Sequence, residues 1–299
     1  MKISNREIEI LDYLMGRKAT FKSVAITLGI KKSNLTKYIK KLERYRLVTL
    51  RRDGQHKEIH LEYAIWFGFF GVRQTFPEIK LKDILIGRVP FLLSFIKNRQ
   101  KFRIRDLDIP AVSAKKILSK LRKTGIIFMP TRGVYSLREE ALPAAEFCRD
   151  VLMQMYVAEG EHEMEDIKQV FFSFDSVLGV EVVFVTGQEN SPKNYWLTSY
   201  SVFHKYGIDL ILAGKYYYTN IKPDLEDIII HTLALSRDIR SIAYVASLMF
   251  RHKFSDKLLK KKQRFGLKEE FITKLIQFVE SKNGKTFEGF PSWEEVEAV

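Results

Sequence analysis

The sequence predicts an α+β fold in two or three domains. Its 299 residues exceed the usual length of one domain, and 46% of them are apolar, which is ample for globular cores. In the first half, apolar residues recur at helical spacing and are followed by short paired β-prone runs. In the second half, strand-like runs precede helical ones. We therefore expect helix-and-hairpin domains first and an α+β domain after them.

The charge changes sign along the chain. There are 50 Lys and Arg against 36 Asp and Glu, a net charge of +14. Residues 1–62 hold 15 basic and 7 acidic residues and residues 80–138 hold 15 and 3, whereas residues 139–250 hold 8 and 17. A cationic half joined to an acidic remainder predicts a polyanion-binding part and a part with another task. Charge alone also fits a Lys-rich protein with solvated charged faces.

Composition argues against several classes of protein. The longest apolar run, residues 64–72, is far shorter than the roughly 20 residues of a membrane span, and the N-terminus has no apolar signal segment. Cys148 is the single cysteine, which excludes an internal disulfide and a Cys-based zinc cluster. No Gly-rich phosphate loop occurs. We expect a cytoplasmic protein without membrane, metal or cofactor.

Residues 1–62 have the spacing of three helices and a hairpin. Asn5 is expected to cap the first helix, Gly29 to end the second and Ser33 to cap the third. Asp53 and Gly54 lie between β-prone runs, which predicts a hairpin. The expected apolar faces are Ile8, Ile10, Leu11, Leu14 and Met15, then Val24, Ala25 and Leu28, then Leu35, Ile39 and Leu42.

This order of elements resembles a winged helix-turn-helix domain, which implies binding to duplex DNA. The third helix would enter the major groove, and the expected base contacts are Asn34, Lys37 and Lys41. The expected contacts to the DNA backbone, from this helix and the wing, are Lys32, Lys40, Arg44, Arg51, Arg52, His56 and Lys57. A winged helix that serves protein contacts is the alternative.

Residues 63–79 connect this domain to the next. Six aromatic residues make the segment too apolar for a flexible linker: Tyr63, Trp66, Phe67, Phe69, Phe70 and Phe76. We expect a connector packed between domains. Burial at a subunit interface and stacking on unpaired bases are the alternatives.

Residues 80–140 resemble a second, less complete winged helix. A helical run from residue 84 to 96 is interrupted at Gly87 and Pro90, and the second helix is abbreviated. Ser113 is expected to cap a basic helix over 114–123, which a hairpin follows. The expected DNA contacts are Lys115, Lys116, Lys120 and Arg132. Dimerisation is the alternative role.

Residues 141–299 predict the C-terminal α+β domain. Strands are expected at 179–187 and 208–213, a strand and then a helix between 195 and 203, and helices at 224–236, 242–250 and 267–280. The tail from Ser281 is expected to fray unless Phe287, Phe290 and Trp293 anchor it.

The segment Lys222–His231, with Pro223, Asp224 and Asp227, resembles the helix start of nucleotidyltransferase-like proteins. These include the abortive-infection type E toxin–antitoxin families, whose antitoxin-repressors join a winged helix to an α/β domain. The resemblance implies a transcription regulator of antitoxin-repressor type. Such a protein would read double-stranded DNA as a homodimer, and its C-terminal domain would sense, dimerise or hold a protein partner such as a toxin.

The competing interpretation is an enzyme that modifies nucleic acids or nucleotides with a nucleotidyltransferase-like C-terminal domain. Its chemistry needs a Gly-Ser loop and paired aspartates that hold Mg²⁺. Here Gly187 is followed by Gln188 and Glu189, and Asp209 stands alone on its expected strand. We therefore expect no catalytic residues and assign the acidic cluster at 224–227 to the charge of a helix N-terminus.

Overall fold

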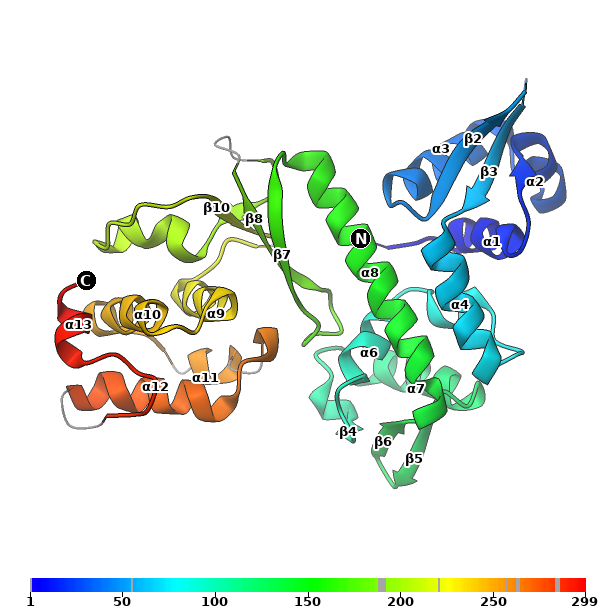
Figure 1. Ribbon diagram of the computed structural model, residues 1–299. Helices are drawn as coiled ribbons and strands as arrows, with labels where there is room; N and C mark the ends of the chain where they lie inside the picture. The colour runs from blue at the N-terminus through cyan, green and yellow to red at the C-terminus, as the bar shows by residue number, and fades with distance from the viewer. Residues whose placement is uncertain are drawn as a thin grey trace. The chain divides into compact units, whose positions relative to one another are not determined.

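The computed structural model describes residues 2–54, 56–187, 192–219, 221–255, 257–261, 264–282 and 286–299. The chain forms two compact units (Figure 1). Unit 1 holds residues 2–159 and 176–180, and unit 2 holds residues 160–175 and 181–299. With 54% helix and 15% strand, the predicted α+β class is confirmed. The finer division at residues 62, 79 and 140 stays a prediction.

The first repeat (residues 4–61) has three helices, a short strand and a hairpin, as the apolar spacing predicts. The predicted stripe of Leu35, Ile39 and Leu42 is buried, and Gly29 ends the second helix with a φ of +61°. The three strands pair antiparallel in the order β1-β3-β2. The elements are α1 (Asn5–Leu14), β1 (Ala19–Thr20), α2 (Phe21–Leu28), α3 (Lys32–Arg44), β2 (Val48–Asp53) and β3 (His56–Leu61).

Two of the predicted helix caps are wrong in this repeat. Ser4, not Asn5, caps α1, because its hydroxyl accepts the Glu7 N–H while the Glu7 carboxylate accepts the Ser4 N–H. The N-cap residue of α3 is Lys31, so Ser33 lies inside the first turn. This turn is exposed, so water can satisfy its backbone N–H groups without a side-chain cap.

The second repeat (residues 89–137) has the same order of elements and the same order of strands, β4-β6-β5. The predicted break at Gly87 is confirmed by its φ of +60°, but Pro90 starts a helix and does not interrupt one. Ser113 again lies inside the first turn, because Pro110 is the N-cap residue. The elements are α6 (Val89–Ile96), β4 (Phe102–Arg103), η1 (Ile104–Asp106), α7 (Ala111–Lys123), β5 (Ile127–Thr131) and β6 (Val134–Leu137), after the short α5 (Leu81–Ile84).

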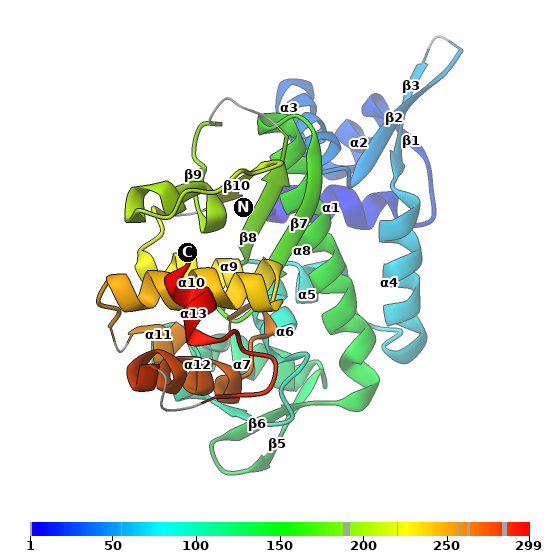
Figure 2. The same ribbon diagram turned by 60° about the vertical axis from the view of Figure 1, so that its left-hand side comes forward.

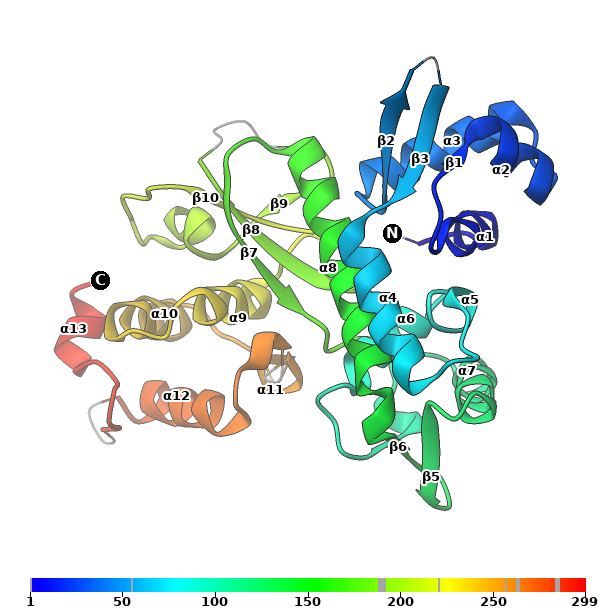
Figure 3. The ribbon, with the colours of Figure 1, turned by 45° about the vertical axis from the view of Figure 1, so that its right-hand side comes forward.

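The predicted aromatic connector is a helix, α4 (Tyr63–Thr75), that packs on one face only. Phe69 is buried, and its ring lies 5.6 Å from that of Phe147 in α8 (Leu142–Glu163), beside which α4 runs (Figure 3). On the other face Tyr63, Phe67 and Phe70 are exposed. One face of the connector is therefore packed, and half of its six aromatic residues lie on or beside that face while the other half are exposed to solvent.

Unit 2 is a four-stranded antiparallel sheet with helices. The strand order is β7-β8-β10-β9, and every residue of the central β8 is buried. The strands are β7 (Ile167–Ser173), β8 (Glu181–Thr186), β9 (Trp196–Leu197) and β10 (Lys215–Tyr218). The helices are η3 (Ser199–Tyr206), α9 (Leu225–Leu235), α10 (Ile239–Arg251), α11 (Lys257–Lys261), η4 (Arg264–Gly266), α12 (Glu269–Ser281) and α13 (Trp293–Glu297).

The strand predicted at 208–213 is wrong. Ile208 is buried, but Ile211 is fully exposed and the segment lies outside the sheet. The sheet position belongs to β10, because Tyr217 and Tyr218 supply the buried side chains. Trp293 anchors the tail, with its ring 5.6 Å from that of Phe278. Within the described ranges, no helix is long and apolar enough to cross a membrane.

Candidate nucleic-acid interface

The helix α3 presents a cationic face to solvent. Its apolar stripe is buried against the rest of the first repeat, so the opposite side chains point outward. The exposed residues there include four of the predicted contacts: Lys32, Asn34, Lys37 and Lys40. Long basic side chains beside a short amide can contact phosphates and base edges in a major groove.

The β2–β3 hairpin adds a second group of cations. It extends away from the helices of the first repeat (Figures 1 and 2). Antiparallel pairing sets Arg52 opposite Lys57 and Asp53 opposite His56, and Arg51, Arg52, His56 and Lys57 are exposed. Gly54 has a φ of +58°, which glycine adopts without strain, whereas Gln55 is outside the described residues.

Two grooves bring the helix and the hairpin together. The first, of about 640 Å³, is lined by Lys22 and Lys32 on the helix side and by His56 and Lys57 on the hairpin side. The second, of about 420 Å³, has Lys40 of α3 facing the hairpin residues Arg51, Arg52 and Lys57. Lys57 lines both grooves. Cations that are distant in the sequence therefore share one continuous surface.

Two predicted contacts of α3 are already paired within unit 1. Lys41 Nζ lies 3.0 Å from the carboxylate of Glu7, whose side chain is 3% exposed, and donates to the carbonyl oxygen of Lys2. Arg44 Nη2 donates to Glu159 Oε1 at 2.8 Å. Both side chains thus form ion pairs that hold α3 against the rest of unit 1. In this they differ from Lys32, Lys37 and Lys40 of the same helix, which are exposed.

The second repeat shows the same separation. Lys115, Lys116 and Arg132 are exposed on α7 and the β5–β6 hairpin, which lie together at one end of the repeat (Figure 3). Lys120 lies 3.3 Å from Asp83 Oδ1 and donates to the carbonyl oxygen of Lys82. The structure therefore divides the predicted contacts into exposed residues and paired ones, which are Lys41 and Arg44 in the first repeat and Lys120 in the second.

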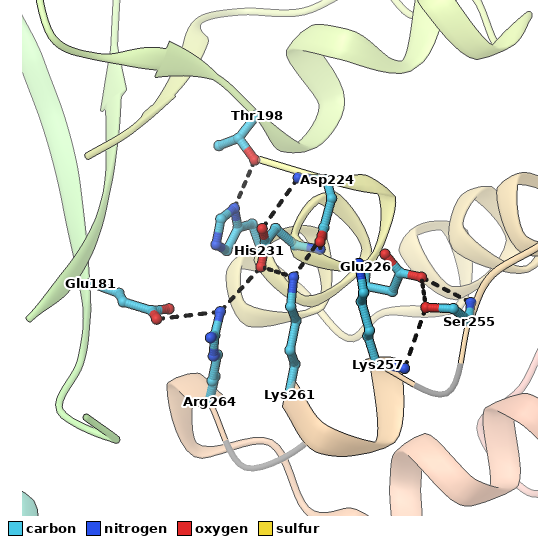
Figure 4. Close-up of polar contacts among 10 residues, drawn as sticks. Glu181, Thr198, Asp224, Glu226, His231, Ser255, Lys257, Lys261 and Arg264 are labelled. Atoms are coloured by element: carbon cyan, nitrogen blue, oxygen red, sulfur yellow. Dashed lines mark hydrogen bonds and ion pairs between the residues drawn. The ribbon is translucent and has the colours of Figure 1, made fainter. Parts of the chain in front are cut away.

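Unit 2 contains a different charged cluster, which is largely buried (Figure 4). Asp224 caps α9, and its capping box includes Asp227. Lys261 Nζ lies 2.6 Å from a carboxylate oxygen of each aspartate. Arg264 Nη1 lies 3.1 Å from Asp227 and 3.2 Å from Glu181. The aspartates singled out by the sequence are thus paired with cations, which the buried carboxylate of Asp227 needs because an unpaired charge in the interior is costly.

Two titratable groups of this cluster are shifted by burial. Burial raises the pKa of Glu181 to about 7, against the favourable charge of Arg264. Burial lowers the pKa of His231 to about 3, so the imidazole is neutral, with Nδ1 hydrogen-bonded to Thr198 Oγ1 at 2.7 Å. Nε2 of His231 has no hydrogen-bond partner among the described residues. The ring packs on Tyr218, 4.4 Å away.

Sequence reasoning missed residues whose partners are distant in the chain. Lys22 lines the first groove from the first turn of α2, which begins three residues before the apolar pattern that predicted this helix. Lys261 and Arg264 come from a Lys-rich run without periodicity, so no pattern linked them to Asp227. Asp209 is exposed, and Gln188 and Glu189 lie outside the described residues.

The part of the chain that the structure describes holds no group of three His, Cys, Asp or Glu side chains placed to bind a metal ion. Comparisons of the chain with models of protein families, with curated proteins and with solved structures found no match.

Proposed function

We propose that the chain is a transcription regulator that binds duplex DNA through a winged helix-turn-helix formed by the first repeat. The observation that carries the proposal is the pair of grooves between the hairpin and the helices α2 and α3, which are lined by exposed cations from both sides. A helix flanked by a basic hairpin matches the shape and charge of a DNA groove between two phosphate backbones.

The exposed residues take different roles in this proposal. Asn34 and Lys37 lie on the outward face of α3 and reach base edges. Lys32 and Lys40, which line the two grooves, contact phosphates. The hairpin residues contact phosphates or the minor groove. Lys41, with Glu7 as its partner, holds α3 in place and makes no base contact.

For unit 2 we propose a sensing, dimerising or partner-binding role, for which a toxin would be the partner in an antitoxin-type repressor. The pairing of Asp224 and Asp227 with Lys261 favours a structural role for these carboxylates. This pairing disfavours the nucleotide-modifying enzyme as the alternative, because that chemistry needs carboxylates available to Mg²⁺.

The test is fluorescence-anisotropy binding of the full chain to random duplex DNA, titrated with salt. With six or more phosphate contacts, affinity should fall by roughly 10³-fold between about 50 and 200 mM salt. Arg51→Ala combined with Arg52→Ala should reduce the slope of log K against log salt by about two, since each phosphate contact contributes about 0.9.

The matched control is Lys205→Ala combined with Lys253→Ala, which removes two exposed positive charges from unit 2. The control should leave the slope unchanged. Equal slopes for the two double variants would place the DNA on another surface. No binding at low salt would overturn the regulator altogether.

A further inference from the structure

The two repeats correspond residue by residue in their third helices. Both α3 and α7 have 13 residues, and position 111 in α7 corresponds to position 32 in α3. The buried stripe of α3 at 35, 39 and 42 is matched by buried residues at 114, 118 and 121 of α7. Val112 therefore occupies the position of Ser33.

The ends of the two helices confirm this correspondence. Each helix is followed by a residue with positive φ, Arg46 at +55° and Gly125 at +75°. The paired lysines, Lys41 and Lys120, also correspond, and each binds a carboxylate and a backbone carbonyl. Both helices are thus held in the same way, and their first turns are the equivalent exposed positions.

The chemistry of these first turns differs. The first turn of α3 carries Lys32, Ser33 and Asn34, which can all hydrogen-bond. The first turn of α7 carries Ala111, Val112 and Ser113. Ser113 matches Asn34 and can also hydrogen-bond, whereas Val112, the match of Ser33, is apolar and 80% exposed. Water covers this branched apolar side chain at the start of the helix. Binding becomes more favourable when an apolar group of a ligand covers it instead.

The positive charges around Val112 favour an anionic ligand. Lys115 and Lys116 lie three and four positions further on, so they share its face of α7, and both are exposed. A second copy of the chain would bring these like charges together, whereas DNA would neutralise them. The apolar group that DNA presents in its major groove is the C5 methyl of thymine.

We propose that the second repeat is also a DNA reader, and that Val112 contacts the C5 methyl of a thymine. This inference rests on the proposed function of the first repeat. It implies that the two repeats read different base chemistry, with hydrogen bonds under α3 and an apolar contact under α7.

The test replaces thymine by deoxyuridine, which has the same base-pairing groups and lacks the C5 methyl. A duplex selected from a random library by the full chain is scanned with one replacement at a time. At one thymine the wild type should lose about fourfold in affinity, the effect of one buried methyl group. Val112→Ala should bind the thymine and deoxyuridine duplexes equally at that position. Ser33→Ala, its match in the first repeat, should keep the fourfold difference.

Several results would overturn the proposal. They are the absence of a selected sequence, no sensitivity to deoxyuridine, or the same sensitivity in Val112→Ala as in the wild type. A change in oligomeric state by light scattering in Val112→Ala would make this residue a protein contact. If the full chain still binds DNA in a salt-dependent way in these cases, the first repeat remains the proposed DNA-binding site. If salt-dependent binding is absent, the proposed function fails as well.

Discussion

In unit 1 Lys32, Lys37 and Lys40 of α3 are exposed, as are the cations of the β2–β3 hairpin, whereas in unit 2 Lys261 and Arg264 share the carboxylate of Asp227, which is nearly inaccessible to water. The side chain of Asp227 is 4% exposed, and that of Lys261 14%. Exposed charges contribute little to stability because water already solvates them. Buried charges need their partners, because an uncompensated charge in the interior is costly. The comparison teaches that unit 1 leaves cations accessible on α3 and the hairpin, where the proposed DNA contact would use them, whereas unit 2 places its cations in internal ion pairs.

The largest effect is expected where the buried cluster is broken. Asp227→Ala removes the buried carboxylate that Lys261 and Arg264 share and leaves them only Asp224 and Glu181, which should lower the free energy of unfolding by about 3 kcal/mol. Chemical denaturation of the full chain measures it. Asp238, the exposed N-cap of α10, is the matched control, and Asp238→Ala should cost about 1 kcal/mol. A similar cost for both would mean that Asp227 contributes only through its capping-box hydrogen bond with the backbone N–H of Asp224.

The next effect is a pH dependence of the free energy of unfolding, to which Glu181 and His231 contribute with opposite signs. Burial raises the pKa of Glu181 from 4.5 to about 7, so the folded state binds this proton more tightly and stability falls as pH rises through that range. Burial lowers the pKa of His231 from 6.5 to about 3, so stability rises with pH between these values. Between pH 4.5 and 6.5 the two contributions cancel.

Glu181→Gln should therefore expose the contribution of His231. Relative to the wild type, its free energy of unfolding should increase by about 1.4 kcal/mol per pH unit above pH 4.5 and level off near pH 7, on the order of 3 kcal/mol in total. Denaturation curves at half-unit pH steps measure this difference. Glu270→Gln, an exposed carboxylate on α12, should show a flat difference over the same range. A flat difference for Glu181→Gln would show that burial does not raise the pKa of Glu181.

The smallest effect distinguishes two lysines one turn apart on α3. Lys41→Ala should destabilise the protein by about 2 kcal/mol, because it leaves the buried carboxylate of Glu7 without its cation. Lys37→Ala should change stability by less than about 0.5 kcal/mol and should weaken DNA binding. Chemical denaturation of the two variants measures their stability, and fluorescence anisotropy measures their affinity for DNA. The reverse assignment would contradict the division between exposed and paired cations.

Local patterns predicted much of the fold. The stripe at Leu35, Ile39 and Leu42 fixed the buried side of α3, and Asp53-Gly54 located the hairpin. Helix starts were less predictable, since Lys31 and Pro110, not the nearby serines, precede α3 and α7. The run at 208–213 looked like a strand because its composition is apolar, although burial stops after Ile208.

The candidate interface was predictable as a list of exposed cations and not as a geometry. Periodicity showed that Lys32 and Lys37 avoid the buried stripe of α3. It could not show that Lys41 meets Glu7, because that contact depends on how α1 packs against α3. The same holds in unit 2, where 34 residues separate Asp227 from Lys261. Pairing between distant residues is a tertiary property, which a single sequence does not display.

Lysine footprinting tests the central claim most directly. The full chain is acetylated with and without duplex DNA, and the modification of each lysine is measured by mass spectrometry. We expect Lys32, Lys37 and Lys57 to react readily in the free chain and to be protected by DNA. Lys261 should react poorly in both conditions because it is paired with Asp224 and Asp227. Protection confined to unit 2, or unchanged reactivity on α3 and the hairpin, would contradict the account.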